Sequence, residues 1–387
     1  MTYLSNHNKA DCCGCQACSY VCPKHCITMV KDNDGGYLYP QIKTEMCISC
    51  HLCEQVCPIN TNSFLHETEA YAYVGTGTPE QVFNSASGGA ATILSDLLVN
   101  NGFVIYGAAW HENLKVVHKR ASNEEECKVF RKSKYVQSDM SQAYGLVHKD
   151  LLEGRNVLFI GLPCQVAAIR NSLKNTRKSD NLYTVQLLCH GITSQYLFDE
   201  YIKEQEIKNH ARIVSYQFKN KRKINGIANS RTGYVVFDNE KTKILTIDKD
   251  PFINLYYNRL CLRPSCSKCH FVNRERVADL TLADAWSIDK VFPNLNPLEG
   301  VSLIITGSEK GVDLLNILKN KMDLRKVSVD WAYNSQKCLK GIPTSIHKNT
   351  DSFLKNYRNI GFEKAVFKAT KPSLILKIKR LLKHLIY

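Results

Sequence analysis

Residues 12–23 read CCGCQACSYVCP and residues 47–58 read CISCHLCEQVCP, and this repeated pattern decides the N-terminal fold. Each copy has the spacing C-x2-C-x2-C-x3-C-P, in which three cysteines hold one 4Fe-4S cluster and the fourth ligates the other cluster. Zinc sites usually take two separated cysteine pairs, and a disulfide framework requires an oxidising compartment. The pattern therefore predicts two clusters with crossed ligands: Cys12, Cys15, Cys18 and Cys57 for the first, and Cys47, Cys50, Cys53 and Cys22 for the second.

The bulk composition indicates a cytoplasmic protein of two or three domains. The chain has 387 residues, of which 44% are hydrophobic, so it can bury a sizeable core. No stretch of the sequence reaches the length of a transmembrane span, and the first residues lack the apolar segment of a secretory signal. Seventeen cysteines without such a signal favour a reducing compartment and metal ligation.

The formal net charge of +15 is concentrated at the C-terminal end, where residues 355–387 contain nine Lys or Arg and one Glu. Residues 373–387, SLILKIKRLLKHLIY, have the pattern of an amphipathic helix with one basic face. Such a helix suits either a peripheral position at the inner face of the cytoplasmic membrane or a protein partner. Basic residues are not interleaved with aromatic residues in a binding motif, so we expect no nucleic-acid partner.

The order of the patterns predicts an α+β or α/β fold, with a bacterial-ferredoxin-like domain followed by a mixed α/β domain of the flavin type. Asp34-Gly35-Gly36 is expected to turn a hairpin, and the turn at residues 85–89 is expected to begin a helix over residues 90–100. The expected segments are 1–66 (two 4Fe-4S clusters), 67–148 and 149–330 (the two parts of the catalytic domain, the second with a third cluster), and 331–387 (an extension with the basic helix).

Cys164 and Cys189 each follow an expected strand, and open α/β sheets bind ligands at the carboxyl ends of their strands. Cys266-x2-Cys269 supplies half of a metal site. These four thiolates would hold a third 4Fe-4S cluster or, as the alternative, a zinc ion, and Cys261 is a substitute ligand. The remaining cysteines are expected to be inert, packing as small apolar side chains or standing without a partner: Cys13, Cys26, Cys127 and Cys338.

Seven motifs occur in an order that resembles the coenzyme F420 hydrogenase/dehydrogenase beta-subunit family. They are SASGG (residues 85–89), KYVQS (134–138), GLPCQVAAI (161–169), LLCHGI (187–192), LRPSCSKCHF (262–271), ADAW (283–286) and GVSLIIT (300–306). The resemblance extends from the cysteine runs to about residue 350. Similar proteins also occur in bacteria that do not make the deazaflavin, often encoded beside genes for surface polysaccharide synthesis. The substrate therefore does not follow from the family name.

This resemblance implies an FAD beside the third cluster, and it assigns residues to the flavin or substrate pocket by their position in the motifs. Those residues are Ser87, Gly88, Gly89 and Thr92 in the turn and its helix, Lys134, Tyr135 and Gln137 along the pocket, and Asp284 in a pattern usually read Gly-Asp-x-Trp-Gly. Ala283 and Ser287 replace both glycines of that pattern, which puts the fit of the cofactor at this loop in question.

The function implied is that of an iron–sulfur flavoprotein oxidoreductase. Electrons would pass between a one-electron carrier, such as ferredoxin or a redox partner subunit, and a small two-electron substrate that is deazaflavin-like or of another kind. The rival hypothesis is a non-catalytic iron–sulfur subunit that delivers electrons to a partner enzyme. A measurement of bound flavin separates the two.

Overall fold

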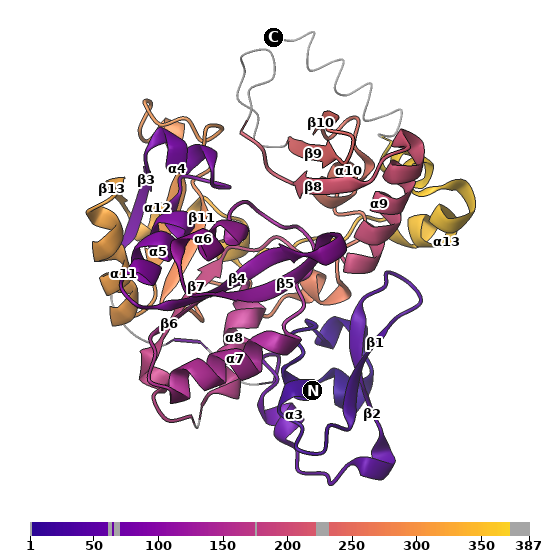
Figure 1. Cartoon of the computed structure of the whole chain (residues 1–387), viewed down its shortest axis with the longest axis horizontal. Coiled ribbons are helices and arrows are strands. Elements are labelled where there is room, and N and C mark those ends of the chain that lie inside the picture. The colour runs from indigo at the N-terminus through magenta and orange to yellow at the C-terminus, as the bar shows by residue number, and fades with distance from the viewer. Residues whose placement is uncertain (1, 61–63, 66–69, 175, 222–231, 372–387) are drawn as a thin grey trace.

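The computed structural model describes residues 2–60, 64–65, 70–174, 176–221 and 232–371 (Figure 1). The expected amphipathic helix over residues 373–387 lies outside these residues. The N-terminal domain lies at one end of the molecule, beside the larger part of the chain, which is built around an eight-stranded sheet. Among the described residues, no helix has the length and apolar character needed to cross a membrane.

The N-terminal domain is small because short elements surround the two cysteine runs. Strand β1 (Ile27–Lys31) pairs antiparallel with β2 (Leu38–Ile42), and Gly36 in the connecting turn has a φ of 70°. The hairpin predicted around Asp34-Gly35-Gly36 is therefore confirmed. The other elements are α1 (Tyr3–Asn6), η1 (Lys9–Asp11), α2 (Ala17–Tyr20), η2 (Thr44–Met46) and α3 (Leu52–Gln55).

The eight-stranded sheet has the order β13-β3-β12-β11-β7-β6-β4-β5. Its strands are β3 (Ala72–Thr76), β4 (Val104–His111), β5 (Lys115–Ala121), β6 (Val157–Gly161), β7 (Leu182–Leu187), β11 (Leu280–Asp284), β12 (Ser302–Thr306) and β13 (Asp323–Val327). The central strands β4, β6, β7 and β11 run parallel, and antiparallel strands flank them on both sides. The predicted mixed α/β fold is confirmed.

Helices cover both faces of this sheet, as the continuous apolar strands predict. Along β6, Val157 and Phe159 pack against α7 (Ser141–Leu152) and α8 (Pro163–Ser172), whereas Leu158 and Ile160 face the opposite core. That second core is formed with α5 (Ala90–Asn100) and α11 (Glu309–Lys319). Helix α5 has the bounds expected from the sequence. Shorter helices complete this part: α4 (Pro79–Phe83), α6 (Glu124–Cys127) and α12 (Val329–Asn334).

A second lobe stands beside the large sheet (Figure 1). Its three-stranded sheet has the order β10-β9-β8 and contains β8 (Ile213–Gln217), β9 (Gly233–Phe237) and β10 (Thr242–Leu245). Its core is aromatic, with Phe198, Tyr216, Phe218 and Phe252 in edge or tilted contacts. The surrounding helices are α9 (Gln195–Asn209), α10 (Pro251–Tyr257), α13 (Thr350–Ile360) and α14 (Phe362–Thr370).

Candidate iron–sulfur and cofactor sites

The two cysteine runs fold as two copies of one loop. A 3-10 turn precedes Cys12 in the first copy, and another precedes Cys47 in the second. Gln16 and His51, which stand at matching positions, both have the left-handed backbone conformation and each begins a one-turn helix. The matching residues before them, Gly14 and Ser49, also have positive φ values. These repeated left-handed residues curl each run around a common centre.

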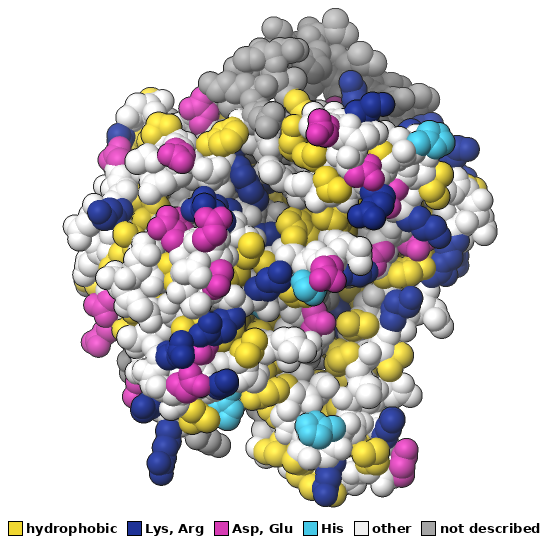
Figure 2. Space-filling view, in the orientation of Figure 1, with side chains coloured by type: hydrophobic (Ala, Val, Ile, Leu, Met, Phe, Trp, Pro, Cys, Tyr) yellow, Lys and Arg dark blue, Asp and Glu magenta, His cyan; other side chains and the backbone are white. Residues whose placement is uncertain are grey.

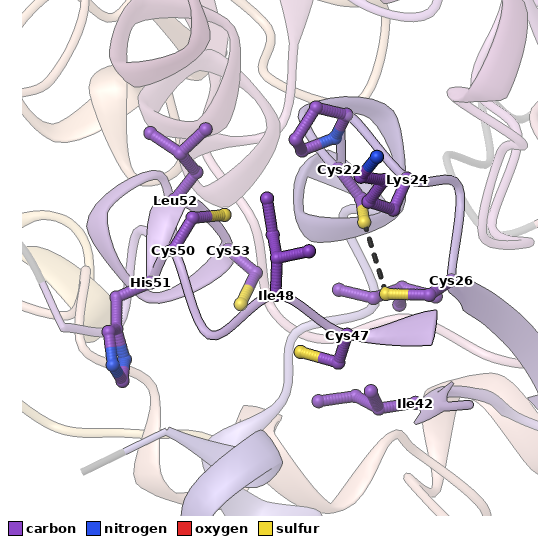
Figure 3. Close-up of a pocket in the computed structure, with 12 residues that line it drawn as sticks. Cys22, Lys24, Cys26, Ile42, Cys47, Ile48, Cys50, His51, Leu52 and Cys53 are labelled. Atoms are coloured by element: carbon purple, nitrogen blue, oxygen red, sulfur yellow. Dashed lines mark hydrogen bonds between the residues drawn. The ribbon is translucent and has the colours of Figure 1, made fainter. Parts of the chain in front are cut away.

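Each predicted ligand set lines one pocket. The first pocket is bordered by Cys12, Cys15, Cys18 and Cys57, and the second by Cys22, Cys47, Cys50 and Cys53. In Figure 3, thiols from both runs border the second pocket. The fourth cysteine of each run therefore lies with the first three of the other run, as the crossed pattern predicts.

The chemistry of these donors fits iron–sulfur clusters. Each pocket offers four thiols, the ligand type that 4Fe-4S clusters take. Burial raises the pKa of Cys57 to about 12 and also raises the pKa of Cys18, so without a cation these thiols would stay protonated. Ligation deprotonates such thiols and releases protons. Among the described residues, no group of three His, Cys, Asp or Glu side chains is arranged around a single metal ion.

The first cysteine loop is fixed to the large domain by hydrogen bonds to its backbone. The Gln137 amide donates to the carbonyls of Cys13 and Gly14, at 2.9 and 3.1 Å. The Tyr144 hydroxyl donates to the Cys15 carbonyl at 2.7 Å. By contrast, Cys47 and Cys50 of the second loop are exposed to solvent. The first pocket therefore faces the large domain, and the second faces outward.

The four cysteines of the predicted third site come together although they are distant in sequence. Cys164 begins α8, Cys189 follows β7, and Cys266 and Cys269 lie in and just after the 3-10 turn η6 (Pro264–Lys268). Burial, together with the charge of the nearby Cys269, raises the pKa of Cys266 to about 12. Burial also raises the pKa of Cys189, with Cys266 and Cys269 adding to the effect. These mutual effects place the thiols within electrostatic range of one another.

Cys13 connects the first pocket with this third group. It lines the first pocket together with Cys12, Cys15, Cys18 and Cys57. It packs beside Cys164 and Cys269 at the edge of the core between the sheet and α8. The sequence interpretation gave Cys13 no role beyond apolar packing, because a side chain beside a cluster loop has no signal that reveals its contacts across domains.

The other spare cysteines differ from one another. Cys26 is buried, as expected, but its Sγ lies 3.3 Å from that of Cys22 in the second pocket. Cys338, which has no partner nearby in sequence, lies close enough to Cys189 to raise its pKa. Cys261, the substitute ligand, packs instead in the aromatic core with Tyr37. Cys127 is buried beside the Ser95 carbonyl, as expected for an inert residue.

Most residues assigned to the turn of the flavin pocket lie at one end of the large sheet. A Cβ atom on Gly88 would stand 2.4 Å from the Gly75 carbonyl oxygen and the Ser302 nitrogen, so only glycine fits there. Gly89 caps α5 with a φ of 103°. The Ser87 hydroxyl donates to the Val301 carbonyl at 2.9 Å. Thr92, one turn along α5, is buried with its hydroxyl 2.7 Å from that of Ser85.

Asp284 belongs to the same end of the sheet, because it pairs in register with Ser302, which pairs with Gly75. Its carboxylate forms an ion pair with Lys219 at 2.8 Å. Lys221 donates to the Ser87 carbonyl, and burial lowers the pKa of Lys221 to about 7. Lys219 and Lys221 were missed in the sequence, although they belong to a basic run that follows β8. In Figure 2, Lys and Arg side chains lie in the hollow between the two lobes.

The structure gives different contacts to the three residues assigned along the pocket, Lys134, Tyr135 and Gln137. The Lys134 ammonium donates to the carbonyls of Val129 and Arg131, both at 2.9 Å. Tyr135 stacks on Tyr256 with ring centroids 4.0 Å apart and an interplanar angle of 8°. The Gln137 amide is engaged by the first cysteine loop. Tyr135 lies within electrostatic range of Asp284, and its stacking partner Tyr256 lies within electrostatic range of Cys189 and Cys266.

Comparisons with known proteins match two parts of the chain to family models. Residues 11–61 match the model of the 4Fe-4S dicluster domain, and residues 154–330 match that of the C terminus of the coenzyme F420 hydrogenase/dehydrogenase beta subunit. No curated protein matches the chain. Among solved structures, the chain is similar to one from the xenon-derivatised F420-reducing NiFe hydrogenase complex of Methanosarcina barkeri. The identity is 15%, 80% of this chain and 92% of that chain are covered, and the TM-score is 0.44.

Proposed function

We propose that this chain, in which a 4Fe-4S dicluster domain precedes a domain of the coenzyme F420 hydrogenase/dehydrogenase beta-subunit family, is an iron–sulfur flavoprotein oxidoreductase. When bound, its clusters would carry single electrons, and an FAD would exchange two electrons with a substrate. The chain's own residues would hold these groups in order, with the first cysteine loop covered by the large domain and the second open to solvent. The observation that carries the proposal is the contact of the first cysteine loop with the large domain: Gln137 and Tyr144 bind its backbone, and Cys13 packs against the same core as Cys164 and Cys269.

That contact supports a third 4Fe-4S cluster held by Cys164, Cys189, Cys266 and Cys269. A zinc ion would stabilise the same loops, but it would not explain why a ferredoxin-type domain is attached at this point. The backbone of the first cysteine loop is fixed by Gln137 and Tyr144, so the two groups of thiols keep a constant separation. Constant separation favours electron transfer between them, because transfer depends steeply on distance.

The outward face of the second pocket supports an order for the relay. Cys47 and Cys50 are exposed, whereas Cys15 is buried against the large domain. A one-electron carrier such as ferredoxin, or a redox partner subunit, would therefore exchange electrons at the second pocket. Electrons would then pass through the first pocket to the third group and the catalytic end of the sheet.

The catalytic end would bind FAD between the turn at Ser87–Gly89 and the Tyr135–Tyr256 pair. Helix α5 begins at this turn, so the positive end of its dipole lies there, and Lys219 and Lys221 add positive charge beside it. These features suit the pyrophosphate of FAD. The stacked tyrosines lie toward the third cysteine group, where a flavin ring would receive electrons. Ala283 and Ser287 leave the strand end more crowded than the glycine-rich pattern does.

The substrate is proposed only as a small two-electron acceptor or donor that is deazaflavin-like or of another kind. A role in surface polysaccharide synthesis stays a prediction. A peripheral membrane contact also stays a prediction, because the residues that carry it lie outside the described part of the chain.

Anaerobic purification followed by iron, sulfide and flavin analysis tests the proposal. About twelve iron atoms and one FAD per chain are expected. About eight iron atoms without flavin would instead establish the electron-delivering role. Eight iron atoms with zinc would leave the ferredoxin domain intact and reject the third cluster.

A substitution at Lys221 tests the location of the flavin. Lys221→Met is expected to weaken FAD binding at least about tenfold, because it removes a cation beside the turn. Lys241→Met, which changes an exposed lysine in the turn between β9 and β10, is the matched control. FAD titration of the flavin-stripped protein, followed by fluorescence, measures both. Equal affinity in the two variants would place the cofactor elsewhere.

A further inference from the structure

Arg263 is a buried cation that reaches from the catalytic domain into the first cysteine loop. Its side chain is 1% exposed, although arginine remains charged in proteins. Nε donates to the Cys12 carbonyl at 2.7 Å, and Nη2 donates to the Leu38 carbonyl at 2.8 Å. Nη1 donates to the Gln137 side-chain oxygen at 3.1 Å. These oxygens are neutral, so they solvate the guanidinium without balancing its charge.

The remaining contact of this guanidinium is with a predicted cluster ligand. Nη2 also donates to Cys12 Sγ, 3.3 Å away. Within the described part of the chain, no carboxylate forms an ion pair with Arg263. A buried charge without a counter-charge is costly, and the sulfur of Cys12 is the one contacting atom that becomes anionic when it ligates iron.

The surroundings keep this contact dry and close. The rings of Tyr39 and Tyr37 lie 4.5 and 5.4 Å from the guanidinium carbon, and both tyrosines are buried. A Cβ atom on Gly14 would stand 2.6 Å from that same carbon. The loop therefore has glycine where the cation approaches, and burial of the guanidinium strengthens its electrostatic effect on the pocket.

We propose that Arg263 sets the reduction potential of the cluster bound by Cys12, Cys15, Cys18 and Cys57, raising it above that of the cluster in the second pocket. Reduction adds one electron, supplied by the external carrier, and makes the cluster more negative. A fixed positive charge and an N–H···S hydrogen bond both stabilise the reduced form. The second pocket has an exposed Lys24 at its rim instead of a buried cation. Electrons entering at the second pocket would thus move inward to a more favourable site. This inference rests on the proposed ligand sets.

Redox titration followed by electron paramagnetic resonance tests the inference on the anaerobic full-length protein. Arg263→Gln removes the charge and is expected to reduce the equilibrium constant for one-electron reduction of one cluster by at least about tenfold, equivalent to about 59 mV. Arg263→Lys retains the charge but not the fork of donors, so its shift should be smaller. Arg131→Gln is the control, because that arginine pairs with Asp96, 3.0 Å away. The shift in reduction potential should persist in the Cys50→Ser and Cys189→Ser backgrounds. These variants remove one ligand from the second and from the third predicted cluster, respectively.

The outcomes are distinguishable from a failure of the proposed function. Fewer than about eight iron atoms in the unaltered protein would reject the ligand sets themselves. Full iron content with unchanged potentials in Arg263→Gln would overturn the role of Arg263. If Arg263→Gln loses the cluster, retention of iron by Arg263→Lys supports the charge-balancing role, and equal loss from both variants overturns it.

Discussion

The Sγ atoms of Cys22 and Cys26 lie 3.3 Å apart on the wall of the second pocket (Figure 3). Cys26 lines this pocket together with the predicted ligands Cys22 and Cys47. Five cysteines border this pocket, although four complete a 4Fe-4S site. The fifth thiol is therefore positioned to replace a missing neighbour.

We expect Cys22→Ser to retain the second cluster with Cys26 as the replacement ligand. The Cys22→Ser, Cys26→Ser double variant should lose about four iron atoms per chain, whereas Cys26→Ser alone should lose none. Cys50→Ser is the comparison for a position without a spare thiol at 3.3 Å, and it should lose the cluster. If Cys22→Ser releases as much iron as Cys50→Ser, the replacement does not occur. Iron analysis and the charge-transfer absorbance of the cluster measure the outcome.

Gly14→Ala should destabilise the junction of the two domains. Gly14 has a φ of 67°, which costs a residue with a Cβ atom about 1–2 kcal/mol. The added Cβ would also meet Arg263 and the Gln137 amide, at 2.6 and 2.7 Å. Gly102→Ala separates the two effects, because Gly102 has a φ of 83° and a Cβ there would meet nothing within 4 Å. Chemical unfolding should show a greater loss of free energy of unfolding for Gly14→Ala than for Gly102→Ala. The iron content of Gly14→Ala should also be reduced. Equal losses would mean that the close approach of Arg263 is unimportant.

The second cluster should be the first to be lost to an iron chelator. Cys47 and Cys50 are exposed, whereas Cys15 is covered by the large domain and its carbonyl is bound by Tyr144. Release of iron from the aerobic protein should therefore show a fast phase of about four atoms. The fast phase should be absent from Cys50→Ser. A single phase for all the iron in the unaltered protein would contradict the outward position of this pocket.

The sequence was sufficient to predict the features that depend on a local pattern of residues. The paired cysteine runs, the hairpin at Gly35-Gly36 and helix α5 all follow from spacing and turn chemistry, and the structure has them where they were expected. The contacts of Cys13 and Arg263 could not be predicted in this way. Both depend on how residues more than a hundred positions apart meet when the N-terminal domain docks, and no local period encodes that docking. Arg263 lies within the motif LRPSCSKCHF, but the motif does not indicate that its side chain contacts the first cysteine loop.

Asp250 gives a pH dependence that is independent of the metal sites. It caps α10 by accepting from the Ile253 amide at 2.8 Å, and it accepts from the Tyr201 hydroxyl. Burial raises the pKa of Asp250 to about 6 from the ordinary value of 3.8. Because the folded-state pKa is the higher one, the folded protein binds more protons between pH 4 and 6. The stability from this group is therefore complete below about pH 4 and is lost as the pH rises through about 6.

Asp250→Asn should remove that pH dependence while keeping an oxygen to cap α10. Relative to the unaltered protein, the variant should gain about 1–2 kcal/mol in free energy of unfolding between pH 5 and 7.5, because about half of the full effect of about 3 kcal/mol is already present at pH 5. Urea unfolding of both proteins at each pH, followed by tyrosine fluorescence, gives the difference in free energy of unfolding. Effects of pH on the clusters are the same in both proteins, so they cancel in this difference. Tyr201→Phe is the control that removes the hydroxyl but leaves the carboxyl group free to titrate. A constant difference between Asp250→Asn and the unaltered protein across this range would show that Asp250 ionises at its ordinary pKa.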